Sequence, residues 1–372
     1  MSELLLHIGT VKTGSTILQS YLKANIDVLK DDGWNYPDFN GKRNHWEFAV
    51  PFQHRLSKEH VSRQIDTPER RARFIAELDE ALAQRVQPDD RWVMTSEYFS
   101  SRLISEAEVA DAVAFLRRFF DKIVVIVFFR RQESILPSYY SQSIKRGESP
   151  RWSWSYCRRR LDHFDYWSIY ARWAVVVGAE NIIALPYLER FKSDSDALRE
   201  HFEAAIDIRM TQEVAAKPRR VNRSLTSEGI AFLREINPEI RRLEADTQSN
   251  TRLRAKTVAR VMALTSDSDK FIPDGRTLAK IADHYRESNA KLVAELGCGP
   301  EWDEWFAHPI DPNQPGSQTK ISRKRRDELI AEVSQPRGPV PREGLNVTSL
   351  RRRSGMLKSA TREMLREGRS KG

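Results

Sequence analysis

The sequence predicts an α/β fold in which a central parallel sheet is flanked by helices, followed by a helical C-terminal half. Two observations carry this prediction. Short apolar runs alternate with helical patterns up to about residue 200, and mostly helical patterns follow. The run Lys122–Phe129, KIVVIVFF, is a continuous β-branched and aromatic stretch, as expected of a central strand buried on both faces.

The chain opens with a strand, a glycine-containing turn and a helix. The apolar run Leu4–Gly9 predicts the strand, and apolar residues at helical spacing over residues 17–29 predict the helix. Gly33 is placed to end this helix, and the residues Trp34–Pro37 then predict a short extended piece.

Further elements follow from capping and apolar patterns. Residues 40–65 are polar with scattered aromatics and predict an irregular excursion, and Arg91–Thr95 and Asn181–Leu185 predict strands. Thr67 before Pro68 predicts one helix start, and Ser105 with Glu108 forms a capping-box pattern at another. The predicted helices cover residues 68–86, 105–120, 132–146, 161–178, 194–206, 225–236, 251–264 and 276–296.

The net charge of +9 sits at one end of the chain. Residues 317–372 hold 15 Lys and Arg against six Asp and Glu, whereas the preceding residues carry 46 of each sign. We therefore expect a folded domain over residues 1–311 and a basic, flexible tail over residues 312–372, with a weak amphipathic pattern at 347–367. Because the body is neutral, we expect no nucleic-acid partner, although the tail allows peripheral contact with a membrane surface.

Composition narrows the class of protein. With 40% hydrophobic and 9% aromatic residues, the chain can build a core, which excludes global disorder. The absence of a run of about 18 apolar residues predicts no transmembrane helix. Because MSELLLHIG is no signal peptide and Cys157 and Cys298 make no disulfide framework, we expect a reduced, cytoplasmic protein of unknown oligomeric state.

The segment Gly9–Thr16, GTVKTGST, is the most informative stretch. It follows a strand and opens a helix, so its main-chain N–H groups and the helix dipole favour an anion. Lys12 adds a full positive charge, and Ser15 and Thr16 add hydroxyl donors. The segment is not a Walker A loop, because that pattern places Lys at position 15.

This segment resembles the phosphosulfate loop of the sulfotransferases that use 3′-phosphoadenosine 5′-phosphosulfate (PAPS). More narrowly, HIGTVKTGSTILQSYL looks like a bacterial branch whose chains open with HIGxxKTGST. The resemblance implies a P-loop-NTPase-like sulfotransferase fold, with PAPS as co-substrate and no metal. It also implies that the donor is bound by Lys12, Thr13, Gly14, Ser15 and Thr16.

A second part of the resemblance concerns the 3′-phosphate of the donor. In the family a central strand ends in Arg and a Ser follows eight residues later, and here these are Arg130 and Ser138. Arg131-Gln132 stands where many relatives have Asn-Pro, and Pro137 lies inside the predicted helix. A weaker resemblance implies that Tyr187 lies near the adenine; the alternative is that its side chain only covers the hydrophobic core. The segment Arg219–Ser224 offers another phosphate contact or a solvated loop.

Sulfuryl transfer needs an anchored donor, neutralisation of the leaving phosphate and a base for the acceptor proton. Lys12 suits the second task. For the base we prefer Glu97, which follows a predicted strand, although it could instead be an N-cap or an ion-pair partner. His45, in the irregular excursion, is the other candidate base, and its alternative is a structural role.

The acceptor is not named by the sequence, and a glycan, a lipid or a small metabolite each fit. The aromatic and basic stretches Trp34–Phe52 and Arg151–Arg160 could bind it, or they could be ordinary packing and a solvated face. Two rival functions remain: a phosphate-loop nucleotide kinase or hydrolase, and an anionic-surface or nucleic-acid binding protein that acts through the tail. The GST of the loop and the strand ending in Arg argue against the first rival.

Overall fold

A five-stranded sheet, all parallel, organises the first of two compact units. The structure is a computed structural model that describes residues 1–39, 44–208, 224–245, 251–297, 299–306 and 309–334. The first unit comprises residues 1–132, 161–221 and 284–309, and the second comprises residues 133–160, 222–283 and 310–372. The predicted division at residue 311 is a different one and stays a prediction.

The strands run in the order β2-β3-β1-β4-β5. They are β1 (Glu3–His7), β2 (Trp34–Asn35), β3 (Arg91–Thr95), β4 (Lys122–Phe129) and β5 (Ile182–Pro186). β1 is central, with Leu6 opposite Met94 of β3 and Val125 of β4. The predicted α/β class with a central parallel sheet is confirmed.

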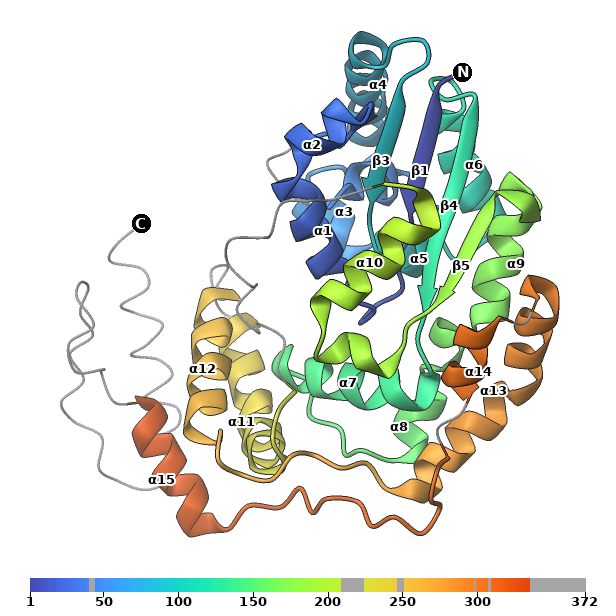
Figure 1. Ribbon diagram of the computed structural model, residues 1–372. Helices are drawn as coiled ribbons and strands as arrows, with labels where there is room; N and C mark the ends of the chain where they lie inside the picture. The colour runs from blue at the N-terminus through green and yellow to red at the C-terminus, as the bar shows by residue number, and fades with distance from the viewer. Residues whose placement is uncertain (40–43, 209–223, 246–250, 298, 307–308, 335–372) are drawn as a thin grey trace. The chain divides into compact units, whose positions relative to one another are not determined.

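Successive side chains of the strands point to opposite faces, and helices cover both faces (Figure 1). The helices of the first unit are α1 (Ser15–Ala24), α2 (Ile26–Asp31), α3 (Lys58–Ser62), α4 (Pro68–Arg85), α5 (Tyr98–Arg102), α6 (Glu106–Leu116), α9 (Tyr166–Val177), α10 (Ser195–Ile206), the greater part of α13 (Gly275–Leu296) and α14 (Pro300–Phe306). Leu5, Val124 and Ile126 pack with α1 and α10, whereas Leu6 and Val125 pack with α6 and α9. Each such large buried side chain stabilises the fold by roughly 1.5–3 kcal/mol.

The helix starts agree with the capping signals. Thr67 accepts from the Arg70 N–H at the start of α4, and Ser105 and Glu108 form the predicted capping box of α6. The helix expected over 161–178 is divided, because Asp165 caps α9 with its side chain after a short 3-10 turn. Further 3-10 turns cover Trp46–Phe48, Val50–Phe52, Leu161–Phe164, Ala179–Asn181 and Glu189–Lys192.

The second unit is helical. Its elements are α8 (Trp154–Arg158), α11 (Ser227–Ala245), α12 (Thr251–Leu264), α15 (Arg323–Ser334), most of α7 (Gln132–Lys145) and the beginning of α13 (Gly275–Leu296). The helix predicted over residues 225–236 is longer in the structure, because α11 continues through Pro238 to Ala245. Next to Pro238, the Asn237 side chain donates to the carbonyls of Ile144 (2.8 Å) and Glu148 (2.7 Å).

Helix α15 lies inside the segment that we expected to be a flexible tail. Its Leu329 is fully buried, and Arg325 donates to the Glu228 carboxylate at 2.7 Å. The abundance of charged residues hid one apolar stripe, Leu329 and Val333, at helical spacing. Residues 335–372, including the amphipathic pattern at 347–367, lie outside the described residues.

Candidate functional site

The loop Gly9–Thr16 lies at the carboxyl end of β1, between β3 and β4. From β1 the chain first builds β2 and β3 on one side and then crosses to β4 on the other. Ligands of open α/β sheets bind where the strand order reverses in this way, outside the carboxyl ends of the strands. The topology therefore brings the loop, the end of β3 and the end of β4 to one edge.

Three residues of the loop have left-handed backbone angles: Gly9 (φ +42°), Lys12 (φ +69°) and Gly14 (φ +77°). Gly14 is the N-cap of α1. For Lys12 this conformation costs about 1–2 kcal/mol, since its Cβ crowds the main chain. Strain of this kind persists only where neighbours fix the backbone, and it gathers at functional sites.

Side chains from several elements fix this backbone. Thr10 Oγ1 donates to the Phe128 carbonyl of β4 at 2.7 Å, and Thr13 Oγ1 donates to the Thr10 carbonyl at 2.7 Å. The Ser100 hydroxyl of α5 donates to the Gly9 carbonyl. Arg130 Nη1 donates to the Lys12 carbonyl at 2.9 Å, which supports the strained residue directly.

The loop presents donors at its helical end. In the described part of the chain the N–H groups of Gly14, Ser15 and Thr16 make no main-chain hydrogen bond. Ser15 Oγ is buried without a partner there, and Thr16 is exposed. Lys12, two residues before Gly14, is half-buried. Such a set of N–H groups, hydroxyls and one ammonium suits an oxyanion.

Arg130 and Tyr187 lie against the loop. Arg130 is only 8% exposed, and burial lowers the pKa of its guanidinium, although Tyr187 and Glu189 counteract that effect. Its guanidinium carbon lies 5.4 Å from the Tyr187 ring centre. A Cβ on Gly14 would lie 3.6 Å from the same ring. The ring is 7% exposed and belongs to the core beside α10, so it offers adenine little surface in this form.

Glu97 follows β3 and is the N-cap residue of α5, but its side chain makes no capping bond. It is half-buried, and in the described residues its carboxylate has no hydrogen bond or ion pair. Its flanks are fixed to the site, because the Ser96 N–H donates to the His7 carbonyl at 3.0 Å and Ser100 contacts Gly9. Glu97 thus places a carboxylate with no structural hydrogen bond in the described residues at the same sheet edge as the loop.

His45 is 1% exposed and both of its ring nitrogens bond to main chain. Nδ1 accepts from the Thr95 N–H at 2.9 Å, so the neutral ring donates from Nε2 to the Pro37 carbonyl at 2.8 Å. Burial lowers the pKa of this imidazole, although main-chain hydrogen bonds with Pro37 and Thr95 partly offset that effect. The ring joins the excursion to the end of β3, as the structural alternative for His45 expects.

The remaining predicted contacts belong to the second unit or lie outside the described residues. Ser138 is on α7, which is helical through Pro137, and its closeness to Arg130 stays a prediction. Of the segment Arg219–Ser224 only Ser224 is described.

Sequence reasoning missed Thr10 and Ser100, which brace the loop, and it missed the bond from the predicted Arg130 to the Lys12 carbonyl. These side chains donate to main-chain carbonyls of distant segments, and no sequence pattern marks such contacts. It also missed Lys192, in the turn after β5, where burial lowers the pKa of the ammonium and Arg130 lowers it further. The sequence signal that could have found Lys192 is its position as a basic residue shortly after Tyr187.

The stretches proposed for the acceptor are largely used in packing. Trp34, Trp46 and Phe52 are buried, and Trp46 stacks on Phe74 with centres 5.6 Å apart. In the second unit the Arg160 guanidinium lies 3.8 Å from the Tyr156 ring centre and donates to Glu148 at 2.8 Å. These aromatic and basic side chains are mainly engaged in packing and ion pairing, which was the alternative to binding an acceptor.

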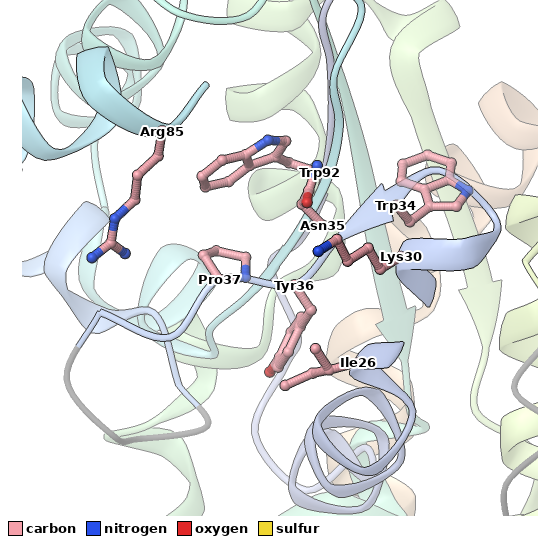
Figure 2. A pocket seen from close by; sticks show the side chains of 8 residues that line it. All are labelled: Ile26, Lys30, Trp34, Asn35, Tyr36, Pro37, Arg85 and Trp92. Carbon is pink, nitrogen blue, oxygen red and sulfur yellow. The ribbon is translucent and has the colours of Figure 1, made fainter. Parts of the chain in front are cut away.

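A cavity of about 230 Å³ lies at the β2 edge of the sheet (Figure 2). It is lined by Ile26, Lys30, Trp34, Asn35, Tyr36, Pro37, Arg85 and Trp92. No predicted catalytic or donor-binding residue is among them. Because Trp92 precedes Thr95 by three residues, it lies about 10 Å back along β3 from the edge that carries the loop.

Comparisons with known proteins find matches among solved structures alone. No protein-family model matches it, and no curated protein does. Eight chains of solved structures match, among them a sulfotransferase from Alicyclobacillus acidocaldarius with 14% identity and a TM-score of 0.37, over 67% of this chain and 97% of that one. A likeness of this size establishes neither a common fold nor a common activity. Among the described helices none is long and apolar enough to cross a membrane, and the described residues contain no group of three or more His, Cys, Asp or Glu suited to a metal ion.

Proposed function

We propose that the protein is a sulfotransferase that moves a sulfuryl group from PAPS to a hydroxyl or amine of an acceptor, such as a glycan. The observation that carries the proposal is the loop Gly9–Thr16. Its strained backbone is braced from β4 and α5, and it offers Ser15, Thr16 and Lys12 to an anion at the N-terminus of α1. The arrangement agrees with the resemblance of TVKTGST to a phosphosulfate loop.

The residues would divide the work as follows. The loop N–H groups and hydroxyls hold the phosphosulfate of the donor, and Arg130 receives its 3′-phosphate. The resemblance implies Ser138 as a second donor to that phosphate and Tyr187 near the adenine, which requires the Tyr187 ring to become more exposed than its present 7%. The bond from sulfur to the bridging oxygen breaks as a bond from sulfur to the acceptor oxygen forms in line. Lys12 neutralises the phosphate that leaves, and Glu97 takes the acceptor proton.

The rival functions find less support among the residues. A phosphate-loop kinase or hydrolase would place a Lys at position 15 and a magnesium-binding Asp at the end of a strand, and here these positions hold Ser15 and Arg130. A protein that acts through its basic tail would keep its activity in residues 335–372. Because α15 packs within the second unit, the chain should be shortened after Ser334 and not after residue 316 to test this rival.

Transfer of labelled sulfate from PAPS to a panel of saccharides, lipids and small phenols or amines tests the proposal. We expect product with at least one acceptor class, at least 100-fold less product with Lys12→Ala, and unchanged transfer with the chain shortened after Ser334. An exposed lysine on α13, changed as Lys291→Ala, is the matched control and should keep full activity. Transfer that survives Lys12→Ala would overturn the role of the loop.

A further inference from the structure

Two buried polar atoms beneath the loop have no hydrogen-bond partner in the described part of the chain: His7 Nε2 and Ser15 Oγ. His7 is 0% exposed and Ser15 is 4% exposed. A buried donor or acceptor left without a partner costs about 1–3 kcal/mol. Fifteen buried side-chain atoms of the described residues lack a hydrogen-bond partner, and these two are set apart because both lie at the anion loop, where a bound ligand could bring a bond between them.

Both atoms border the same point in space. A Cβ built on Gly9 would lie 2.9 Å from Ser15 Oγ and 3.6 Å from His7 Nε2. Gly9 also has φ +42°, so two constraints keep a side chain out of this position. The space between the imidazole edge and the Ser15 hydroxyl is therefore left open by a glycine.

The other ring nitrogen of His7 faces a hydroxyl, which can donate to the ring or accept from it. His7 Nδ1 lies 2.8 Å from Thr95 Oγ1, and the ring packs edge-on against Phe128 and Phe202. Burial lowers the pKa of His7 to about 4, so the ring is neutral near pH 7. A neutral ring that accepts the Thr95 hydroxyl proton at Nδ1 carries its own hydrogen on Nε2.

We propose that His7 is a positioning residue for the anion loop, whose Nε2–H donates to Ser15 Oγ when an anion binds, so that the Ser15 hydroxyl proton is directed at that anion. The hydrogen bonds then run in one direction, from Thr95 through His7 and Ser15 to the anion, and each polarises the next. The proposal rests on the proposed function, because the anion is the phosphosulfate of PAPS or the 5′-phosphate of its product.

Binding of 3′,5′-adenosine bisphosphate to His7→Phe, measured by calorimetry, tests this role. The phenyl ring suits the neighbours Phe128 and Phe202, but it removes the bond to Thr95 together with the unpaired Nε2, so the free protein should lose some stability. We expect about tenfold weaker binding of the bisphosphate by the folded variant. A purely structural histidine would lower the stability and leave the affinity unchanged. The exposed His54, changed in the same way to Phe, should leave affinity unaltered.

A double-mutant cycle with Ser15→Ala isolates the pair. If His7 acts through Ser15, His7→Phe should weaken binding no further once Ser15→Ala is present. Additive losses would overturn the proposal, and so would a His7→Phe protein that binds the bisphosphate as tightly as the wild type.

The tautomer of His7 decides the matter even if a variant fails to fold. Nitrogen-15 NMR of the wild-type protein should show hydrogen on Nε2, and hydrogen on Nδ1 would overturn the proposal. If the wild type binds no bisphosphate, the proposed function fails, whereas tight wild-type binding with the wrong tautomer refutes this inference alone.

Discussion

Replacing Gly14 with Ala tests the geometry of the loop most sharply. Gly14 has φ +77°, and a Cβ there would lie 2.3 Å from Leu198 Cδ2 of α10. The left-handed conformation costs Ala about 1–2 kcal/mol, and displacing the Leu198 methyl group adds about 1–3 kcal/mol of overpacking. The expected loss of stability is therefore about 3 kcal/mol.

Gly33 provides a matched control. It has φ +81°, and a Cβ there would meet nothing within 4 Å. Gly33→Ala therefore bears only the conformational cost, and the difference between the two variants measures the crowding against α10. Urea unfolding followed by Trp fluorescence gives both values, provided that the slopes agree.

A third variant checks the source of the difference. Leu198→Ala removes the methyl group that the new Cβ would meet. On that background Gly14→Ala should lower the free energy of unfolding by about as little as Gly33→Ala does. If Gly14→Ala is no more destabilising than Gly33→Ala in the wild-type protein, then α10 does not pack over the loop and our account of the site is wrong.

Three further predictions concern charge and protons. Burial lowers the pKa of His7 from 6.5 to about 4, so the unfolded chain binds the proton first as the pH falls. The free energy of unfolding should therefore be nearly constant above about pH 6.5 and should drop by about 2 kcal/mol by pH 5 for His7 alone, with a smaller share from the partly exposed His163. Equal urea midpoints at pH 7.5 and 5 would contradict this. Arg130→Lys keeps the charge but cannot both donate to the Lys12 carbonyl and fork onto a phosphate, so bisphosphate affinity should fall about tenfold in calorimetry, and unchanged affinity would remove Arg130 from the site. Glu97→Gln should lower the turnover number at least 100-fold in a folded protein, whereas His45→Ala should mainly lower the urea midpoint; the reverse pattern would make His45 the base.

The parts of the fold that depend on local pattern could be predicted from the sequence. KIVVIVFF forms β4 as expected, and Ser105 with Glu108 begins α6. The errors arise where one local signal competes with distant contacts. The helix predicted over residues 225–236 is too short, because α11 continues to Ala245, and the charges of residues 323–334 concealed a helix whose Leu329 is buried.

The site divides in the same way. The loop could be found because glycines, Lys12 and hydroxyls stand together in a short segment between a strand and a helix. The contact of Arg130 with the Lys12 carbonyl could not be found, since it joins residues 118 positions apart. The same holds for His45, whose environment is fixed by main-chain groups of Thr95 and Pro37. Sequence spacing identifies chemistry along one segment but not the partners that meet it across a sheet.

The central claim is that the loop Gly9–Thr16 binds a nucleotide phosphorylated at both its 3′ and 5′ ends. Calorimetric titration with 3′,5′-adenosine bisphosphate, beside ATP at the same salt concentration, tests it most directly. The account predicts saturable binding of the bisphosphate at least tenfold tighter than that of ATP, and loss of this preference in Lys12→Ala. Equal affinity for the two nucleotides, or tighter binding of ATP, would contradict it.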